Sequence, residues 1–122
     1  IDKNSHHYIK YLVGSFPIPD LLVHMPGTMN NEAIIEIKTT QLQYTGIVKD
    51  ITNLSIFVER ANYKRAIFMI FGNDFSEEKL DKIKEIFFIM HKKGINVKPI
   101  EIWLHYNHGQ KAQKIHTLEI AG

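Results

Sequence analysis

The sequence predicts an α/β domain in which a mixed central β-sheet is flanked by helices. Three observations lead to this fold class. Short segments rich in β-favouring residues open the chain, helical periodicity begins near residue 46, and each helical segment is followed by a strand-like segment. Strands separated by helices favour parallel pairing, whereas an early hairpin requires antiparallel pairing, so we expect both in one sheet.

The first part of the chain is expected to contain three strands. The segment 8–13 alternates in character, 21–23 is a short apolar run, and 33–40 has a body of isoleucines. Turn-forming Pro, Gly and Asn residues lie between 26 and 31. This spacing predicts that 21–23 and 33–40 form a hairpin.

The second part is expected to alternate helices with strands. Apolar residues at steps of three and four predict a helix over 47–61, and the run 66–71 is typical of a strand buried on both faces. Asp74 and Glu77 have capping-box spacing before a second helix, whose natural C-cap is Gly94. Two further strands are expected over 100–106 and near 115–120, joined by a turn at 107–109.

Length and composition predict one globular domain over residues 1–122. The chain has 122 residues, of which 44% are hydrophobic and 23% charged, which argues against disordered and collagen-like classes. Because it begins at Ile1 rather than Met, a piece of a longer protein is the open alternative. No cysteine is present, which excludes disulfide scaffolds, thiol nucleophiles and cysteine-type zinc sites.

Charge and hydropathy bear on partners and location. Fifteen Lys and Arg against thirteen Asp and Glu give a net charge of +2, which permits nucleic-acid contact without requiring it. No apolar run approaches the roughly 18 residues that a membrane span needs, and no signal-peptide pattern opens the chain. We therefore expect an intracellular, cytoplasmic protein with no membrane partner.

The candidate chemistry begins with an acid and a lysine inside the strand at 33–40. Glu36 and Lys38 are two residues apart, so both project from one face of the strand, about 6.6 Å apart along it. Ile35 and Ile37 are expected to face the other way, into apolar packing. An unpaired charge is costly to bury, so the two charged groups should meet solvent or share a partner.

A second carboxylate is expected to join this pair. Asp20 begins the preceding strand, and the hairpin can return Glu36 to its side. Two carboxylates and one lysine at the edge or end of a sheet suit Mg²⁺, which prefers hard oxygen ligands together with waters and phosphate oxygens. The open alternative is that Asp20 is a turn residue while Glu36 and Lys38 form a solvated surface pair.

These fragments resemble the PD-(D/E)XK nucleases, a superfamily that includes many restriction endonucleases and Holliday-junction resolvases. The resemblance rests on Pro19 and Asp20, on Glu36 and Lys38, and on the order of elements over roughly residues 8–72. It implies a restriction-endonuclease-like fold.

The resemblance also implies roles for the matching residues. Asp20 and Glu36 would hold Mg²⁺ or Mn²⁺ with help from the carbonyl of Ile37. Lys38 would orient or activate the attacking water, or stabilise the charge that develops at phosphorus. The resemblance identifies no nucleic-acid-binding residues.

The function implied is that of a Mg²⁺-dependent endonuclease that hydrolyses phosphodiester bonds of DNA, of restriction or defence type. A Holliday-junction resolvase, an RNA endonuclease of the same fold, and an inactive module that binds nucleic acid or protein are the alternatives. The expected partner is therefore DNA, with RNA and a homodimer left open.

Other conspicuous residues favour structural roles. His105 and His108 with His116 could supply nitrogen ligands to zinc, but exposed polar histidines are the better interpretation. His24, four residues after Asp20, is the histidine to examine for contact with the site. Trp103 is expected in the core rather than as a platform for base stacking.

Overall fold

The computed structural model describes residues 21–24, 31–107 and 109–120 of the chain. Within these ranges, five strands and two helices follow one another along the sequence. The elements are β1 (Leu21–His24), β2 (Asn31–Thr39), α2 (Tyr44–Ala61), β3 (Arg65–Phe71), α3 (Glu77–Lys92), β4 (Ile100–His105) and β5 (Gln113–Leu118). The strand expected over 8–13 lies outside the described residues.

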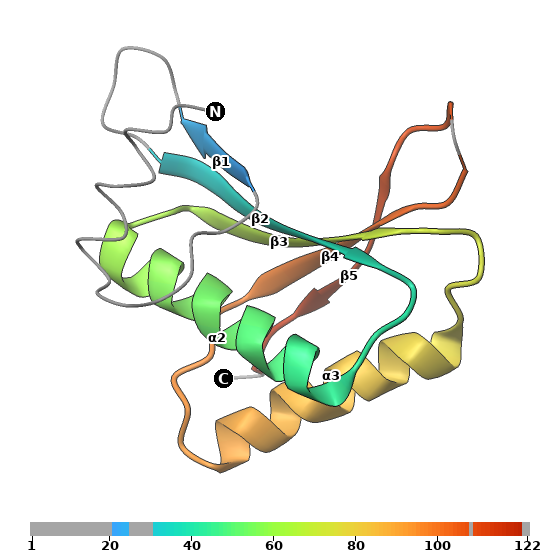
Figure 1. The fold of residues 1–122 in the computed structure, drawn as a ribbon. Helices are drawn as coiled ribbons and strands as arrows, with labels where there is room; N and C mark the ends of the chain where they lie inside the picture. Colours follow the sequence, from blue (N-terminus) through green and yellow to red (C-terminus); the bar gives the residue numbers. More distant parts are fainter. Residues whose placement is uncertain (1–20, 25–30, 108, 121–122) are drawn as a thin grey trace.

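The five strands form one mixed sheet in the order β1-β2-β3-β4-β5 (Figure 1). The outer pairs, β1 with β2 and β4 with β5, are antiparallel, whereas β2, β3 and β4 run parallel to one another. The α/β class with a mixed sheet is therefore confirmed, and so is the hairpin expected near the start of the chain.

Both described helices lie on one side of the sheet and pack against each other (Figure 1). The chain steps in a single direction from β2 to β3 to β4, with one helix in each connection. Right-handed crossovers taken in one direction place successive helices on the same side, which explains the single helix layer.

The start of α3 differs from the prediction. Ser76 is the N-cap, and its hydroxyl accepts a hydrogen bond from the backbone N–H of Lys79 at 3.3 Å. The capping box expected from Asp74 and Glu77 is therefore wrong, because the Asp74 carboxylate accepts a hydrogen bond from a hydroxyl at the end of β2 instead. Gly94, the expected C-cap, lies just beyond the end of α3 with a φ of 88°.

The main hydrophobic core lies between the sheet and the helix layer. Ile34 on β2, Phe68 and Ile70 on β3, and Ile102 on β4 point into it, and each has 0% exposure. The helix α2 covers them with a stripe of apolar residues spaced by three and four, as its sequence predicts. This stripe consists of Ile47, Ile51, Leu54, Phe57 and Ala61.

The opposite side of the sheet is covered by none of the described helices, and we call it the open face. Its residues alternate along each strand with those that face the core. They are Ala33, Ile35, Ile37 and Thr39 on β2, Arg65, Ile67, Met69 and Phe71 on β3, Glu101, Trp103 and His105 on β4, and Lys114 and Thr117 on β5.

Several expectations about burial are wrong on the open face. Ile37 is 43% exposed and so does not pack into apolar surroundings as expected, whereas Ile35 is half-buried. In β3, residues 66–70 are buried or half-buried on both faces as expected, but Phe71 at the end of the strand is 40% exposed. Trp103 is half-buried and donates its indole N–H to Glu101 Oε1 at 3.0 Å, outside the core. The common reason is that the helix layer covers only the other face.

The turn after β3 depends on a glycine. Gly72 has a φ of 143°, and a Cβ built there would lie 2.7 Å from Thr40 Cγ2. Its backbone N–H donates to the carbonyl of His105 at 3.1 Å, which fixes the turn against the end of β4. The end of β2 and the turn after β3 therefore pack too closely for any side chain larger than hydrogen.

We expect Gly72→Ala to lower the free energy of unfolding by about 2–4 kcal/mol, because it combines backbone strain with a steric clash. Gly94→Ala is the matched control, since Gly94 also has a positive φ but a Cβ there meets nothing within 4 Å. It should cost about 1–2 kcal/mol from the backbone alone. Urea denaturation of both variants measures the difference, and equal losses would show that the contact with Thr40 does not matter.

Candidate functional site

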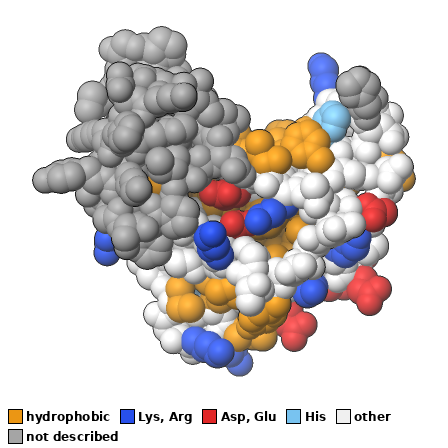
Figure 2. Space-filling view, in the orientation of Figure 1, with side chains coloured by type: hydrophobic (Ala, Val, Ile, Leu, Met, Phe, Trp, Pro, Cys, Tyr) orange, Lys and Arg blue, Asp and Glu red, His pale blue; other side chains and the backbone are white. Residues whose placement is uncertain are grey.

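The predicted acid and lysine lie in the part of β2 that pairs with no described strand on one of its two sides. β1 pairs with β2 only as far as Ile35, the Cα partner of Leu21. The remainder of β2, from Glu36 to Thr39, pairs with β3 on its other side and with no described strand on this side. In Figure 2, acidic and basic side chains adjoin near the middle of the view.

Glu36 points toward the helix layer. Its position alternates with that of Ile35 and matches that of Ile34, a core residue, and its Cα partner in the sheet is the fully buried Phe68. Glu36 is only 8% exposed. A carboxyl group is therefore held among core residues. Burial of a carboxylate costs free energy, so this position is unusual for a residue of a solvated surface pair.

Lys38 lies on the same side of β2, as its spacing from Glu36 predicts, and meets a partner from the helix layer. Its Nζ is 3.0 Å from Asp50 Oδ2, and the Asp50 side chain is 5% exposed whereas that of Lys38 is 36% exposed. The ammonium is thus anchored on its buried side while part of the side chain remains accessible to solvent.

Sequence reasoning missed Asp50, although the sequence contains a signal for it. Asp50 falls within the apolar stripe of α2, three residues after Ile47 and directly before Ile51, and all three are buried. A carboxylate at a position of the stripe that faces the sheet needs a partner, and the lysine of β2 is that partner.

The Lys38 ammonium borders a small hollow at the connection from β2 to α2. The hollow has a volume of about 160 Å³ and is lined by Lys38, Gln41, Leu42, Gln43, Gly46 and Ile47. A Cβ at Gly46 would lie 3.8 Å from Lys38 Nζ, so the absence of a side chain keeps space open beside the charge. The first turn of α2 contains no acidic residue, and Gln43 makes no side-chain cap.

The end of β2 is tied to the loop before α3 by a second polar group. The Thr40 hydroxyl donates to Asp74 Oδ1, and Lys79 Nζ lies 3.5 Å from Asp74 Oδ2. The hydrogen bond from Thr40, followed by the charge of Lys79, holds the pKa of Asp74 below its usual value. These contacts fix the strand end just after Lys38.

The other predicted site residues are placed only in part. Asp20 lies outside the described residues, as does the side chain of His24. Ile37 lies in β2 between Glu36 and Lys38, with its side chain on the open face. Within the described ranges, no three acidic, histidine or cysteine side chains come together as a group that could hold a metal ion.

The candidate histidines point in different directions. The His105 ring lies 5.0 Å from the Phe71 ring on the open face, whereas His116 is the Cα partner of the core residue Ile102. Burial, together with the nearby charge of Lys84, lowers the pKa of His116. His108 lies outside the described residues.

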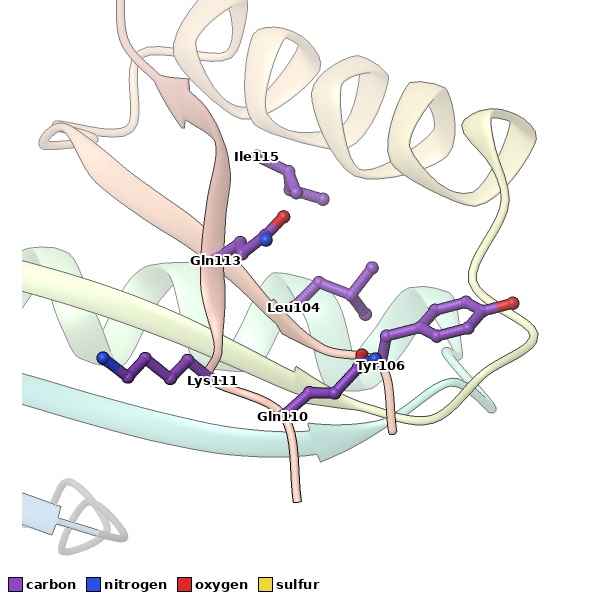
Figure 3. A pocket seen from close by; sticks show the side chains of 6 residues that line it. All are labelled: Leu104, Tyr106, Gln110, Lys111, Gln113 and Ile115. Atoms are coloured by element: carbon purple, nitrogen blue, oxygen red, sulfur yellow. The ribbon is translucent and has the colours of Figure 1, made fainter. Parts of the chain in front are cut away.

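A larger hollow is lined by residues of β4, β5 and the segment between them, and by neither Glu36 nor Lys38 (Figure 3). It has a volume of about 470 Å³. Tyr106 and Ile115 flank it, while the side chain of Lys111 extends in a different direction. This hollow contains no carboxylate and therefore offers no ligand of the kind that the predicted chemistry needs.

None of the helices in the described part of the chain is long and apolar enough to cross a membrane. Comparison with protein-family models, with curated protein sequences and with solved structures gives no match for this chain.

Proposed function

We propose that this chain is a Mg²⁺-dependent endonuclease of restriction or defence type that hydrolyses phosphodiester bonds of DNA. The observation that carries the proposal is the placement of Glu36 and Lys38. Both lie on the helix-facing side of β2, along an edge that no described strand covers, and Lys38 is held 3.0 Å from Asp50.

We assign Asp20 as the second metal ligand beside Glu36. Asp20 directly precedes Leu21 in the sequence, and the Cα partner of Leu21 is Ile35, which directly precedes Glu36. If the antiparallel ladder continued by one pair beyond Leu21 and Ile35, the next pair would be Asp20 and Glu36, which are the two carboxylates of the proposed site.

The described donors are of the kind that Mg²⁺ and Mn²⁺ bind. Glu36 offers carboxylate oxygens, and Ile37 offers a backbone carbonyl oxygen, both hard ligands. A divalent cation held there would polarise a phosphoryl oxygen and lower the pKa of a bound water. The low exposure of Glu36 limits the number of rotamers open to its side chain and keeps its oxygens at the strand edge.

Lys38 supplies a second positive charge, which belongs to the protein itself and adds to that of the proposed metal ion. Asp50 holds one side of the ammonium, and the hollow at the start of α2 gives the other side access to a phosphate. From there, Lys38 can donate a hydrogen bond to a non-bridging oxygen as negative charge develops at phosphorus, or orient the attacking water. Asp50 acts through Lys38 and is therefore a positioning residue.

Nicking of supercoiled plasmid with Mg²⁺, with Mn²⁺ and with EDTA tests the proposal. We expect metal-dependent nicking by the natural chain and its loss in Lys38→Met. Lys64→Met is the matched control, because Lys64 also forms an ion pair with a glutamate of β2, Glu32, at 3.2 Å, but on the exposed surface. The control should nick at the natural rate.

Single-stranded RNA offered in parallel distinguishes the RNA endonuclease. The absence of metal-dependent cleavage of both plasmid and RNA would contradict the proposal, as would equal nicking by Lys38→Met and Lys64→Met.

A further inference from the structure

We propose that the open face of the sheet is a stacking platform for single-stranded nucleic acid, and that it guides a strand toward Glu36 and Lys38. The inference rests on the proposed nuclease function and narrows its substrate class to unpaired strands, which in supercoiled DNA are locally unpaired segments. It is carried by the exposed side chains of the open face and by their order across the strands.

The open face presents aromatic rings that nothing described covers. Phe71 is 40% exposed, and its ring is tilted by 48° against the His105 ring at 5.0 Å. Trp103 lies two residues before His105 on the same face and is half-buried. Figure 2 shows hydrophobic side chains gathered beside a histidine on the upper side of the molecule. Rings on the surface of a sheet are what unstacked bases pack against.

The charges on the open face suit a phosphate backbone better than a second apolar surface. The only carboxylate among its described positions, Glu101, is bound by Arg65 through two hydrogen bonds of 2.7 Å. Hydrogen bonding from Arg65 accordingly lowers the pKa of Glu101. Lys114, the Cα partner of Trp103, is exposed, so a positive charge remains beside the indole.

The register connects this platform to the proposed site. Trp103, Met69 and Ile37 are Cα partners in one row across β4, β3 and β2, and His105, Phe71 and Thr39 form the next row. Each row spans about 10 Å, from β4 to the part of β2 that no described strand pairs with on its other side. Ile37 lies between Glu36 and Lys38, whose side chains point to the opposite, helix-facing side, so a nucleic-acid strand that crosses the open face has to pass around this part of β2 to reach them.

Trp103 is the only tryptophan of the chain and reports directly on this surface. We would titrate the chain of residues 1–122 with a 15-nucleotide oligothymidylate in EDTA, so that binding is read without cleavage. We expect saturable quenching of Trp103 emission by the oligothymidylate and by oligouridylate, but not by a 15-base-pair duplex, whose bases are already stacked. A stronger response to one of the two oligonucleotides would identify DNA or RNA as the preferred ligand.

Two variants isolate the contribution of the rings and the charge. Phe71→Leu keeps an apolar side chain but removes the ring, and should raise the Kd by about 5- to 150-fold, the range for loss of one stacked base. Lys114→Gln should lower the slope of log Kd against log salt concentration by about 0.7. Phe88→Leu is the matched control, because Phe88 is 51% exposed on α3, in the helix layer. It should leave the Kd unchanged.

The absence of saturable quenching, or an unchanged Kd in Phe71→Leu, would overturn the inference. Emission that depends on protein concentration without oligonucleotide would assign the face to a second copy of the chain instead. Because binding is measured in EDTA, failure of the platform is distinguishable from failure of the nuclease. Binding of the oligonucleotide without nicking of plasmid would support the stacking platform and contradict the proposed nuclease function.

Discussion

The Glu36→Gln protein is expected to lose metal-dependent nicking by more than about 100-fold, because replacement of a ligand should cost at least as much as loss of a residue that only supports one. The amide has nearly the same shape as the carboxylate but lacks its charge, so the buried position should remain filled. The measurement is the initial rate of plasmid nicking in Mg²⁺ and in Mn²⁺.

Thermal unfolding separates loss of metal from loss of fold. Mn²⁺ at about 100 times its Kd should stabilise the natural chain by about 2.7 kcal/mol and should not shift the Tm of Glu36→Gln. Glu32→Gln is the matched control, since Glu32 lies four residues earlier on the same strand and pairs with Lys64 at the surface. Nicking by Glu36→Gln at the rate of the Glu32→Gln control would show that Glu36 is not a metal ligand.

Truncation of the central core residue should have the largest effect on stability. Phe68→Ala is expected to lower the free energy of unfolding by about 3–5 kcal/mol, because Phe68 has 0% exposure in the middle strand of the sheet and belongs to the main hydrophobic core. Urea denaturation followed by far-UV circular dichroism measures the loss.

Phe88→Ala provides the comparison for the same chemical change at the surface. Phe88 is 51% exposed, and its ring lies 5.0 Å from Lys92 Nζ. Its truncation should cost less than about 1 kcal/mol. Similar losses for the two variants would mean that Phe68 does not occupy the core that lies between the sheet and the helices.

The sequence alone was sufficient for most of the element order. The apolar run at 66–71 became β3, the stripe from Ile47 to Ala61 became the buried side of α2, and the early hairpin formed as expected. These features depend on periodicity and turn chemistry, which act between residues close in the chain. The same periodicity correctly placed Glu36 and Lys38 on one side of their strand.

The tertiary structure decided which side of each strand is covered. A period of two fixes only that neighbouring residues point in opposite directions, so it could not tell whether Glu36 or Ile37 would meet the helices. The one-directional crossovers put both described helices on the side of Glu36 and left Ile37, Phe71 and Trp103 on the open face.

The partner of Lys38 was decided in the same way. Asp50 lies twelve residues further along the chain, and it reaches the lysine only because α2 packs across β2 and β3. The sequence therefore determined which groups share a face, through local alternation. Only the packing of the helix layer determined which groups meet across it, because that choice depends on strand order and crossover handedness rather than on neighbours in the chain.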